Sequence, residues 1–134
     1  GGIMPDVFVP VDTTGLTPYF MKLFQKNLIF RYAQRTTDRY RKEINAMESL
    51  AELDRFFADK NLFYDFVAFA DREGVHPTET EMTLSKPLIE AQIRGYIGRN
   101  TSLDETAFYY YIFPQDQTLL RAARVLGGGV GSGD

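Results

Sequence analysis

Cysteine and tryptophan are absent from this chain of 134 residues, and histidine occurs once, at position 76. Without cysteine the chain forms no disulfide, no thiolate nucleophile and no zinc site with sulfur ligands. A single histidine also excludes a metal site with two histidine ligands. The lack of cysteine leaves the cellular compartment open, because such a chain folds equally well in reducing and oxidising surroundings.

A surplus of positive charge and long apolar runs are missing as well. Lys and Arg number 15 against 18 Asp and Glu, which leaves a net charge of -3. A protein that binds the nucleic-acid backbone needs an excess of basic residues, and a membrane-spanning helix needs about 20 consecutive apolar residues. We therefore expect neither a nucleic-acid partner nor a membrane-spanning segment.

Aromatic residues are plentiful, at 14% of the chain, with 11 Phe and 8 Tyr. They predict a core built from large, flat side chains. The hydrophobic fraction of 44% is that of a soluble globular protein. The length suits one domain with a single core and is too short for two independent ones.

The first residues differ from all that follow. Val7 to Val11 is a β-branched run with Pro5 before it and Pro10 within it, a pattern typical of extended chain. Because proline lacks an amide donor, such a segment pairs only as an edge strand or a short strand. No other part of the sequence alternates with the period of a strand, so we expect the hydrogen-bonding partner of this segment to lie outside residues 1–134.

From Thr17 onward the start and stop signals are those of helices. Thr17 followed by Pro18 is a typical helix start. The aromatic-rich run that follows predicts one largely buried helix as far as Tyr32. The charged run 35–47 predicts a second helix, mostly solvated.

Two further helices are indicated before residue 75. Ser49 with Glu52 has the spacing of a capping box and precedes a short amphipathic helix. Asp59 is the expected start of the next helix, which carries a wide apolar stripe. Gly74 is its expected left-handed C-cap.

A second capping box, Thr78 with Glu81, begins a helix that reaches Asn100. Pro87 disfavours helical geometry at the residue before it and removes a backbone donor. Either this helix kinks at Pro87, or a new helix starts there with Ser85 as its cap.

The last part of the domain repeats these signals. Ser102 with Glu105 is a third capping-box pair. The apolar run 107–113 resembles a strand by itself, but the cap before it and Pro114 after it favour a short helix. A final helix is expected over 116–126.

These signals predict an all-α fold of five to seven short helices packed as an irregular bundle, preceded by a short extended segment. The helical domain is expected to cover residues 17–126. Residues 127–134, GGGVGSGD, have the composition of a flexible tail.

Two short motifs resemble catalytic ones without meeting their requirements. Asp12-Thr13-Thr14-Gly15 has one residue more than the Asp-Thr-Gly loop of aspartic proteases, and no second loop supplies the other carboxylate. We interpret it as a turn before the first helix. Ser85 and Lys86 are adjacent, and neighbouring helical residues point about 100° apart, so a serine-lysine pair is not expected.

The remaining candidates also have structural interpretations. His76 lies in a predicted surface loop, and the basic residues Arg31, Arg35, Arg39, Arg41 and Lys42 are interrupted by acidic ones and predict a solvated face. The triplet Tyr109, Tyr110, Tyr111 spans about 200° of a helix, so at least one ring packs inward, and the others could serve recognition. The glycine-rich tail lacks dinucleotide-binding spacing. We expect no catalytic, cofactor-binding or metal-binding residue, and no cofactor.

A family resemblance runs along much of the chain. Residues 1–6, GGIMPD, followed by VFVP, resemble the GGI-x-PD segment that closes the protease domain of carboxy-terminal processing, or tail-specific, serine peptidases. Residues 11–14, 66–75 and 88–100 are similar, more loosely, to the helical C-terminal region of Bacteroidetes-type members.

The resemblance implies that residues 1–16 are an extended segment at the end of an upstream protease domain, and that the helical region lies beside that domain. The serine nucleophile, the lysine base and the peptide-binding PDZ module of that family have no matching positions here, so this chain alone is expected to be inactive. It would be a non-catalytic structural or docking region of a periplasmic or cell-envelope peptidase that cleaves protein substrates. Its partners would be the upstream protease domain and, through it, those substrates. The alternative is a free-standing helical module that binds a partner helix or a second copy of itself.

Overall fold

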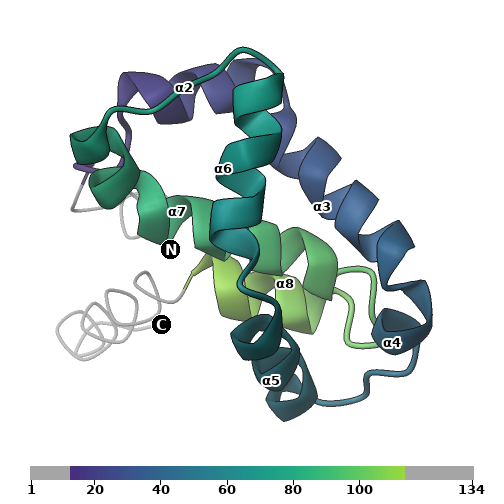
Figure 1. The fold of residues 1–134 in the computed structure, drawn as a ribbon. Coiled ribbons are helices and arrows are strands. Elements are labelled where there is room, and N and C mark those ends of the chain that lie inside the picture. Colours follow the sequence, from purple (N-terminus) through teal and green to yellow (C-terminus); the bar gives the residue numbers. More distant parts are fainter. Residues whose placement is uncertain (1–12, 114–134) are drawn as a thin grey trace, which may run out of the picture. The chain divides into compact units, whose positions relative to one another are not determined.

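Seven helices and no strand are formed by residues 13–113, the part of the chain that this computed structural model describes (Figure 1). The predicted all-α bundle of five to seven helices is thereby confirmed. In chain order the helices are α2 (Pro18–Gln25), α3 (Leu28–Arg39), α4 (Arg41–Asn45), α5 (Leu50–Lys60), α6 (Leu62–Arg72), α7 (Glu79–Gly98) and α8 (Glu105–Ile112). The expected extended run over 7–11, the helix over 116–126 and the tail over 127–134 lie outside the described residues.

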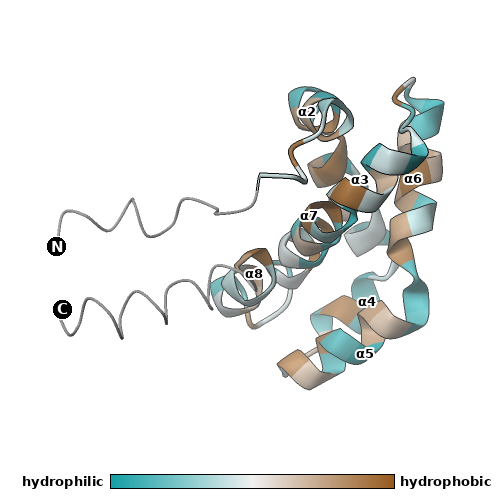
Figure 2. Cartoon of the chain, turned by 90° about the vertical axis from the view of Figure 1, so that its left-hand side faces the viewer, coloured by the Kyte–Doolittle hydropathy of each residue, from teal (hydrophilic) through white to brown (hydrophobic). Residues whose placement is uncertain are grey.

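Helix α7 is the central element of the unit formed by residues 14–112. It packs against α2, α3, α6 and α8, and Figure 2 shows it between α8 and the group formed by α2, α3 and α6. Ile89, Ile93 and Ile97 recur at four-residue spacing on α7 and are fully buried, as expected for one face of a helix. None of the helices within residues 13–113 is long and apolar enough to cross a membrane.

Left-handed asparagines divide the chain where the sequence predicted continuous helix. Asn27, at a φ of 57°, separates α2 from α3, so the single helix expected from Thr17 to Tyr32 is wrong. Asn61, at a φ of 48°, separates α5 from α6. Helix α6 therefore begins at Leu62 and not at Asp59. Asparagine is among the few residues that enter the left-handed region at low cost.

The charged run 35–47 is also not one solvated helix. Helix α3 continues through it to Arg39, and α4 begins at Arg41 after a break at Tyr40. Although the run is rich in charged residues, four of its side chains are buried: Thr36, Thr37, Ile44 and Met47.

The predicted caps mostly form. Thr17, Ser49 and Thr78 each accept a hydrogen bond from the backbone N–H three residues on, at helix starts. Gly74, at a φ of 86°, ends α6. These caps are local in sequence, which is why spacing alone identifies them.

The predicted cap at Ser102 does not form, and at Pro87 the chain does not adopt the alternative of a new helix start. Ser102 donates to the carbonyl of Met47, 2.9 Å away, and α8 begins at Glu105 without that cap. Helix α7 runs through Pro87 without a new start, and Ser85 is buried within it. Thr83, whose carbonyl loses its helical donor at Pro87, is exposed, so water can satisfy it.

Glu81 joins the start of α7 to the start of α2. Its Oε1 accepts the N–H of Thr78 at 3.0 Å, which completes the capping box, while its Oε2 accepts the N–H of Tyr19 at 3.0 Å. Hydrogen bonds from these backbone groups, that of Thr78 above all, hold the pKa of Glu81 below its usual range.

A second contact lies one turn along α7. The Ser85 hydroxyl donates to the carbonyl of Gly15 at 2.8 Å and lies 2.7 Å from the Thr17 hydroxyl. A Cβ on Gly15 would lie 2.7 Å from Leu88 Cδ1 and 3.1 Å from the backbone oxygen of Leu84, so glycine favours this close approach to α7.

At the other end of α7, glycine sets the approach of α8. A Cβ built on Gly98 would lie 2.8 Å from the Cβ of buried Ala107. No rotation of a side chain relieves a contact between two β-carbons, so the helices themselves would have to separate.

We expect Gly98→Val to lower the free energy of unfolding by about 1–3 kcal/mol, the usual cost of forcing extra volume into a packed core. Ala68→Val, at an exposed position of α6, is the control for the effect of a branched residue on a helix and should cost only a few tenths, roughly. Urea denaturation followed by circular dichroism measures both. Equal losses in the two variants would contradict the packing argument.

We expect acid to weaken the fold partly through Glu81. Because its folded pKa is lowered, its contribution is present above the unfolded pKa of about 4.5 and is lost as the pH falls through the folded pKa. Glu81→Gln has one acceptor oxygen for two N–H groups, so it should lower the melting temperature at pH 7. Because glutamine does not titrate, the melting temperature of the variant should also fall less steeply below pH 4.5.

Glu52→Gln is the matched control for that measurement. Glu52 also accepts a backbone N–H, that of Glu48 at 2.8 Å, but both residues lie at the same helix start. Its loss should therefore leave the contact between α2 and α7 intact and cost less than Glu81→Gln. Melting curves at pH 7 that rank the two variants the other way would show that Glu81 does not join the two helices.

Candidate functional site

The Asp-Thr-Thr-Gly motif is described only from Thr13 onward. Asp12 lies outside the described residues, and Thr14 and Gly15 form a turn, in agreement with the predicted turn before the first helix. The carbonyl of Gly15 is taken up by the hydroxyl of Ser85. This segment therefore serves the packing of α2 against α7.

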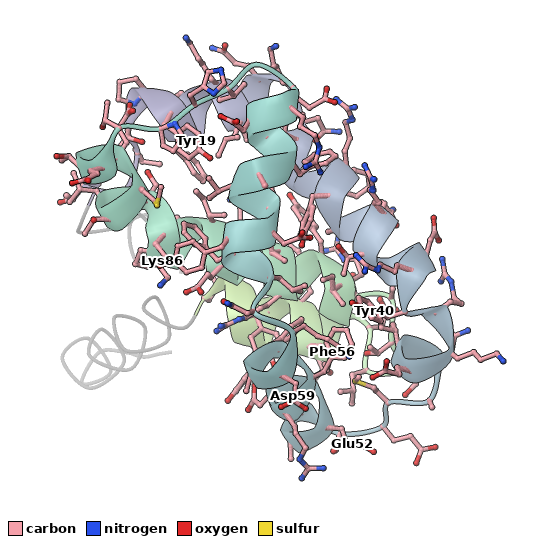
Figure 3. All side chains as sticks on the ribbon, viewed as in Figure 1. Tyr19, Tyr40, Glu52, Phe56, Asp59 and Lys86 are labelled. Carbon is pink, nitrogen blue, oxygen red and sulfur yellow. The ribbon has the colours of Figure 1, made fainter. Side chains whose placement is uncertain are left out.

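Ser85 and Lys86 point to different surroundings. The Ser85 side chain is fully buried next to Gly15 and Thr17. The Lys86 ammonium lies over two rings of α6, 5.3 Å from the centroid of Phe63 and 5.2 Å from that of Tyr64 (Figure 3). The amine is therefore not placed to act as a base for the serine. This agrees with the sequence analysis, which expected no serine-lysine pair.

His76 lies on the surface, with 63% of its side chain exposed. Its Nδ1 contacts the carboxylate of Asp71. No nucleophile accompanies this pair in the interactions of the described residues, and a histidine-carboxylate contact at an exposed helix end is an ordinary ion pair when the ring is protonated.

Four of the five basic residues of α3 and α4, all except Lys42, make an ion pair or a cation-π contact. Arg31 pairs with Glu73 at 3.4 Å and Arg41 with Asp38. Two more cap aromatic rings, as the Arg35 guanidinium lies 5.5 Å from the Phe69 centroid and that of Arg39 lies 5.4 Å from Tyr40. These contacts give a surface on which ion pairs and cation-π contacts alternate.

The tyrosine triplet divides between core and surface, as its spacing predicted. Tyr111 is buried, and its hydroxyl contacts the carboxylate of Asp54. Burial, followed by that hydrogen bond, raises the pKa of Tyr111 far above its ordinary value. Tyr109 and Tyr110 remain 48% and 40% exposed.

An apolar stripe follows the outer side of α2. Leu16, Met21 and Phe24 are 47%, 42% and 64% exposed. Leu16 precedes the N-cap and Met21 is the fourth helical residue, positions that lie together at a helix start, and Phe24 follows Met21 by three residues on the same side. We refer to these three residues as the α2 stripe.

A cavity of about 370 Å³ opens where α5, α6 and α7 meet. Its polar side chains are Asn61, Glu90 and Arg94. The rest of its lining is formed by Phe57, Ala58, Leu62, Phe63 and Ile93. Sequence reasoning missed this site, although one signal was present, because Lys86, Glu90 and Arg94 recur at four-residue spacing and therefore share one face of α7.

No group of three or more His, Asp and Glu side chains within residues 13–113 is arranged to hold a metal ion. Two buried hydroxyl groups in the same range, those of Tyr19 and Thr37, have no hydrogen-bond partner. Burial, together with the nearby carboxylates of Asp71 and Glu81, raises the pKa of Tyr19 to about 12. Neither hydroxyl lines the cavity.

We expect Tyr19→Phe to stabilise the fold or to leave it unchanged, because it removes a buried hydroxyl that makes no hydrogen bond. Tyr32→Phe is the matched comparison. The Tyr32 hydroxyl donates a hydrogen bond to the Asp65 carboxylate at 2.6 Å. Tyr32→Phe should therefore lower the free energy of unfolding by about 1–3 kcal/mol. Denaturation midpoints that fall equally in both variants would show that the Tyr19 hydroxyl has a partner after all.

The comparisons with known proteins give one family. Searches of curated proteins and of solved structures found no match. The model of DUF8443, described as a family of unknown function, matches residues 19–102, which is more than half of the chain. The match begins in α2 and extends past the end of α7, so it includes the α2 residues Met21 and Phe24 and every residue that lines the cavity. The chain therefore belongs to the DUF8443 family.

Proposed function

We propose that residues 14–112 are a non-catalytic docking module of a tail-specific serine peptidase, and that the α2 stripe is its contact with the protease domain. The observation that carries the proposal is the exposure of the three stripe residues, of which Phe24 at 64% is the most exposed large apolar side chain of the described residues. Apolar and aromatic side chains buried at the centre of an interface supply most of its binding energy.

The chemistry-bearing side chains support a structural role. Ser85, His76 and Tyr111 each contact another residue of the same fold. A catalytic group has to face a substrate, and the hydroxyls of Ser85 and Tyr111 belong to buried residues. The exposed α2 stripe is apolar, which suits binding better than catalysis.

The order of the chain favours the protease domain as the partner. The GGI-x-PD segment, which resembles the end of that domain, closes at Asp6, and α2 begins at Pro18. Twelve residues span at most about 40 Å. So short a tether keeps the α2 stripe at high effective concentration near the domain that precedes it. The same resemblance supports a location in the periplasm or cell envelope.

Self-association is the second candidate. It is favoured by Tyr109 and Tyr110, adjacent aromatic side chains that are each at least 40% exposed on α8. Tyrosine is enriched at protein interfaces because it combines a large apolar ring with a polar end. In this case the α8 tyrosines, rather than the α2 stripe, would form the interface.

We expect the reading frame before Gly1 to encode the serine and lysine of the peptidase family. In that longer protein the α2 amides should exchange with deuterium more slowly than in residues 1–134 alone, because docking covers the stripe. The double variant Met21→Ser, Phe24→Ser should abolish this difference. Upstream sequence without the two catalytic residues, or equal exchange in both proteins, would contradict the proposal.

Tyr109→Ser with Tyr110→Ser is the matched control, since it also removes two exposed apolar side chains. It should leave the slowed exchange of α2 unchanged. Light scattering of residues 1–134 over a range of concentrations tests the second candidate function, self-association. A mass that rises with concentration and returns to that of a monomer in the α8 tyrosine variant would favour self-association instead.

A further inference from the structure

The cavity at the meeting point of α5, α6 and α7 is not used by the docking proposal, and none of the α2 stripe residues lines it. Its volume of about 370 Å³ lies at the lower end of the range for small-molecule sites. Such sites combine apolar walls with a few convergent polar groups. The cavity has both, and it is the feature of the unit that remains without a role.

The walls suit an apolar side chain. Phe57 and Phe63 line the cavity with Leu62 and Ile93. Phe57, Phe63 and Ile93 are themselves at least 94% buried, so the packing of the core holds their positions. A guest that fits between two aromatic rings and two aliphatic chains has a branched aliphatic or an aromatic side chain.

The polar side chains offer one charge of each sign. Arg94 Nη2 lies 3.8 Å from Glu90 Oε2, an ion pair too long for a hydrogen bond. The side chains are 39% and 29% exposed, and the guanidinium lies 5.7 Å from the centroid of Phe57. Both groups therefore keep hydrogen-bonding capacity for a ligand at the edge of the apolar wall.

The backbone has the same two-sided polarity. Phe57 and Ala58 belong to the last turns of α5, whose end carries partial negative charge, whereas Leu62 and Phe63 open α6, whose start carries partial positive charge. The left-handed Asn61 brings these two ends together. A ligand with a net charge would oppose one of the two ends, while a zwitterion matches both.

We propose that this cavity binds a free α-amino acid with an apolar side chain. Arg94 receives its carboxylate and Glu90 its ammonium group, and the side chain lies against Phe57 and Phe63. An α-amino acid is the smallest ligand that carries both charges next to an apolar group. The inference stands apart from the docking proposal, because it concerns another surface and another class of ligand.

The test is an NMR titration of the whole chain with L-leucine. We expect a dissociation constant on the order of 1 mM, with amide shifts that cluster in residues 57–63 and 90–94. L-leucinamide lacks the carboxylate and N-acetyl-L-leucine lacks the ammonium, so each should bind at least tenfold more weakly, roughly 1.4 kcal/mol of lost affinity.

Variants provide a second and independent set of outcomes. Arg94→Gln and Glu90→Gln should each weaken L-leucine binding at least tenfold, while Arg31→Gln, which removes the cation of an exposed ion pair that does not line the cavity, should leave it unchanged. Absence of shifts at 50-fold the expected dissociation constant would overturn the proposal. Equal binding of L-leucine and N-acetyl-L-leucine would overturn it too, because the cavity would then recognise an anion alone.

Discussion

The carboxylate of Glu81 holds the starts of two helices at once, and this junction fixes how α2 lies against the central helix α7. One oxygen caps α7 and the other accepts the N–H of Tyr19 in α2. Ser85, one turn further along α7, bonds to Gly15 and Thr17 and fixes the same crossing from within the core. Because α2 is held on its inner side, its apolar side chains Met21 and Phe24 remain on the outside.

Helix identity could be predicted from the sequence where the signal was local. Thr17, Ser49 and Thr78 cap helices because a short polar side chain reaches an N–H three residues away, a relation that any helix start repeats. The breaks were missed for the opposite reason. Asparagine enters the left-handed region at a lower cost than most residues, so packing can decide whether Asn27 and Asn61 continue or end a helix.

Long-range partners could not be predicted at all. Ser102 matches a capping box in spacing, but the carbonyl of Met47, distant in sequence, takes its hydroxyl. Ser85 looked like a cap before Pro87 and is instead a buried donor to Gly15. The cavity is formed by residues of three helices, so no regular spacing in the sequence connects its lining residues. The only signal in the sequence was the row of charged residues on α7 that includes Glu90 and Arg94.

The surface formed by α3 and the end of α6 differs from that of α2, because the first carries paired charged groups and the second carries exposed apolar side chains. On α3 and at the end of α6, Arg31 and His76 contact carboxylates and Arg35 lies over a ring, and exposed ion pairs of this kind contribute little energy. Phe24 and the other α2 stripe residues expose apolar area to water. A partner that covers them would bind favourably because it removes that area from water. Under the docking proposal, recognition of a large partner would therefore rest on apolar contact. Charge would act more strongly in the proposed ligand cavity, where Glu90 and Arg94 are partly shielded from solvent.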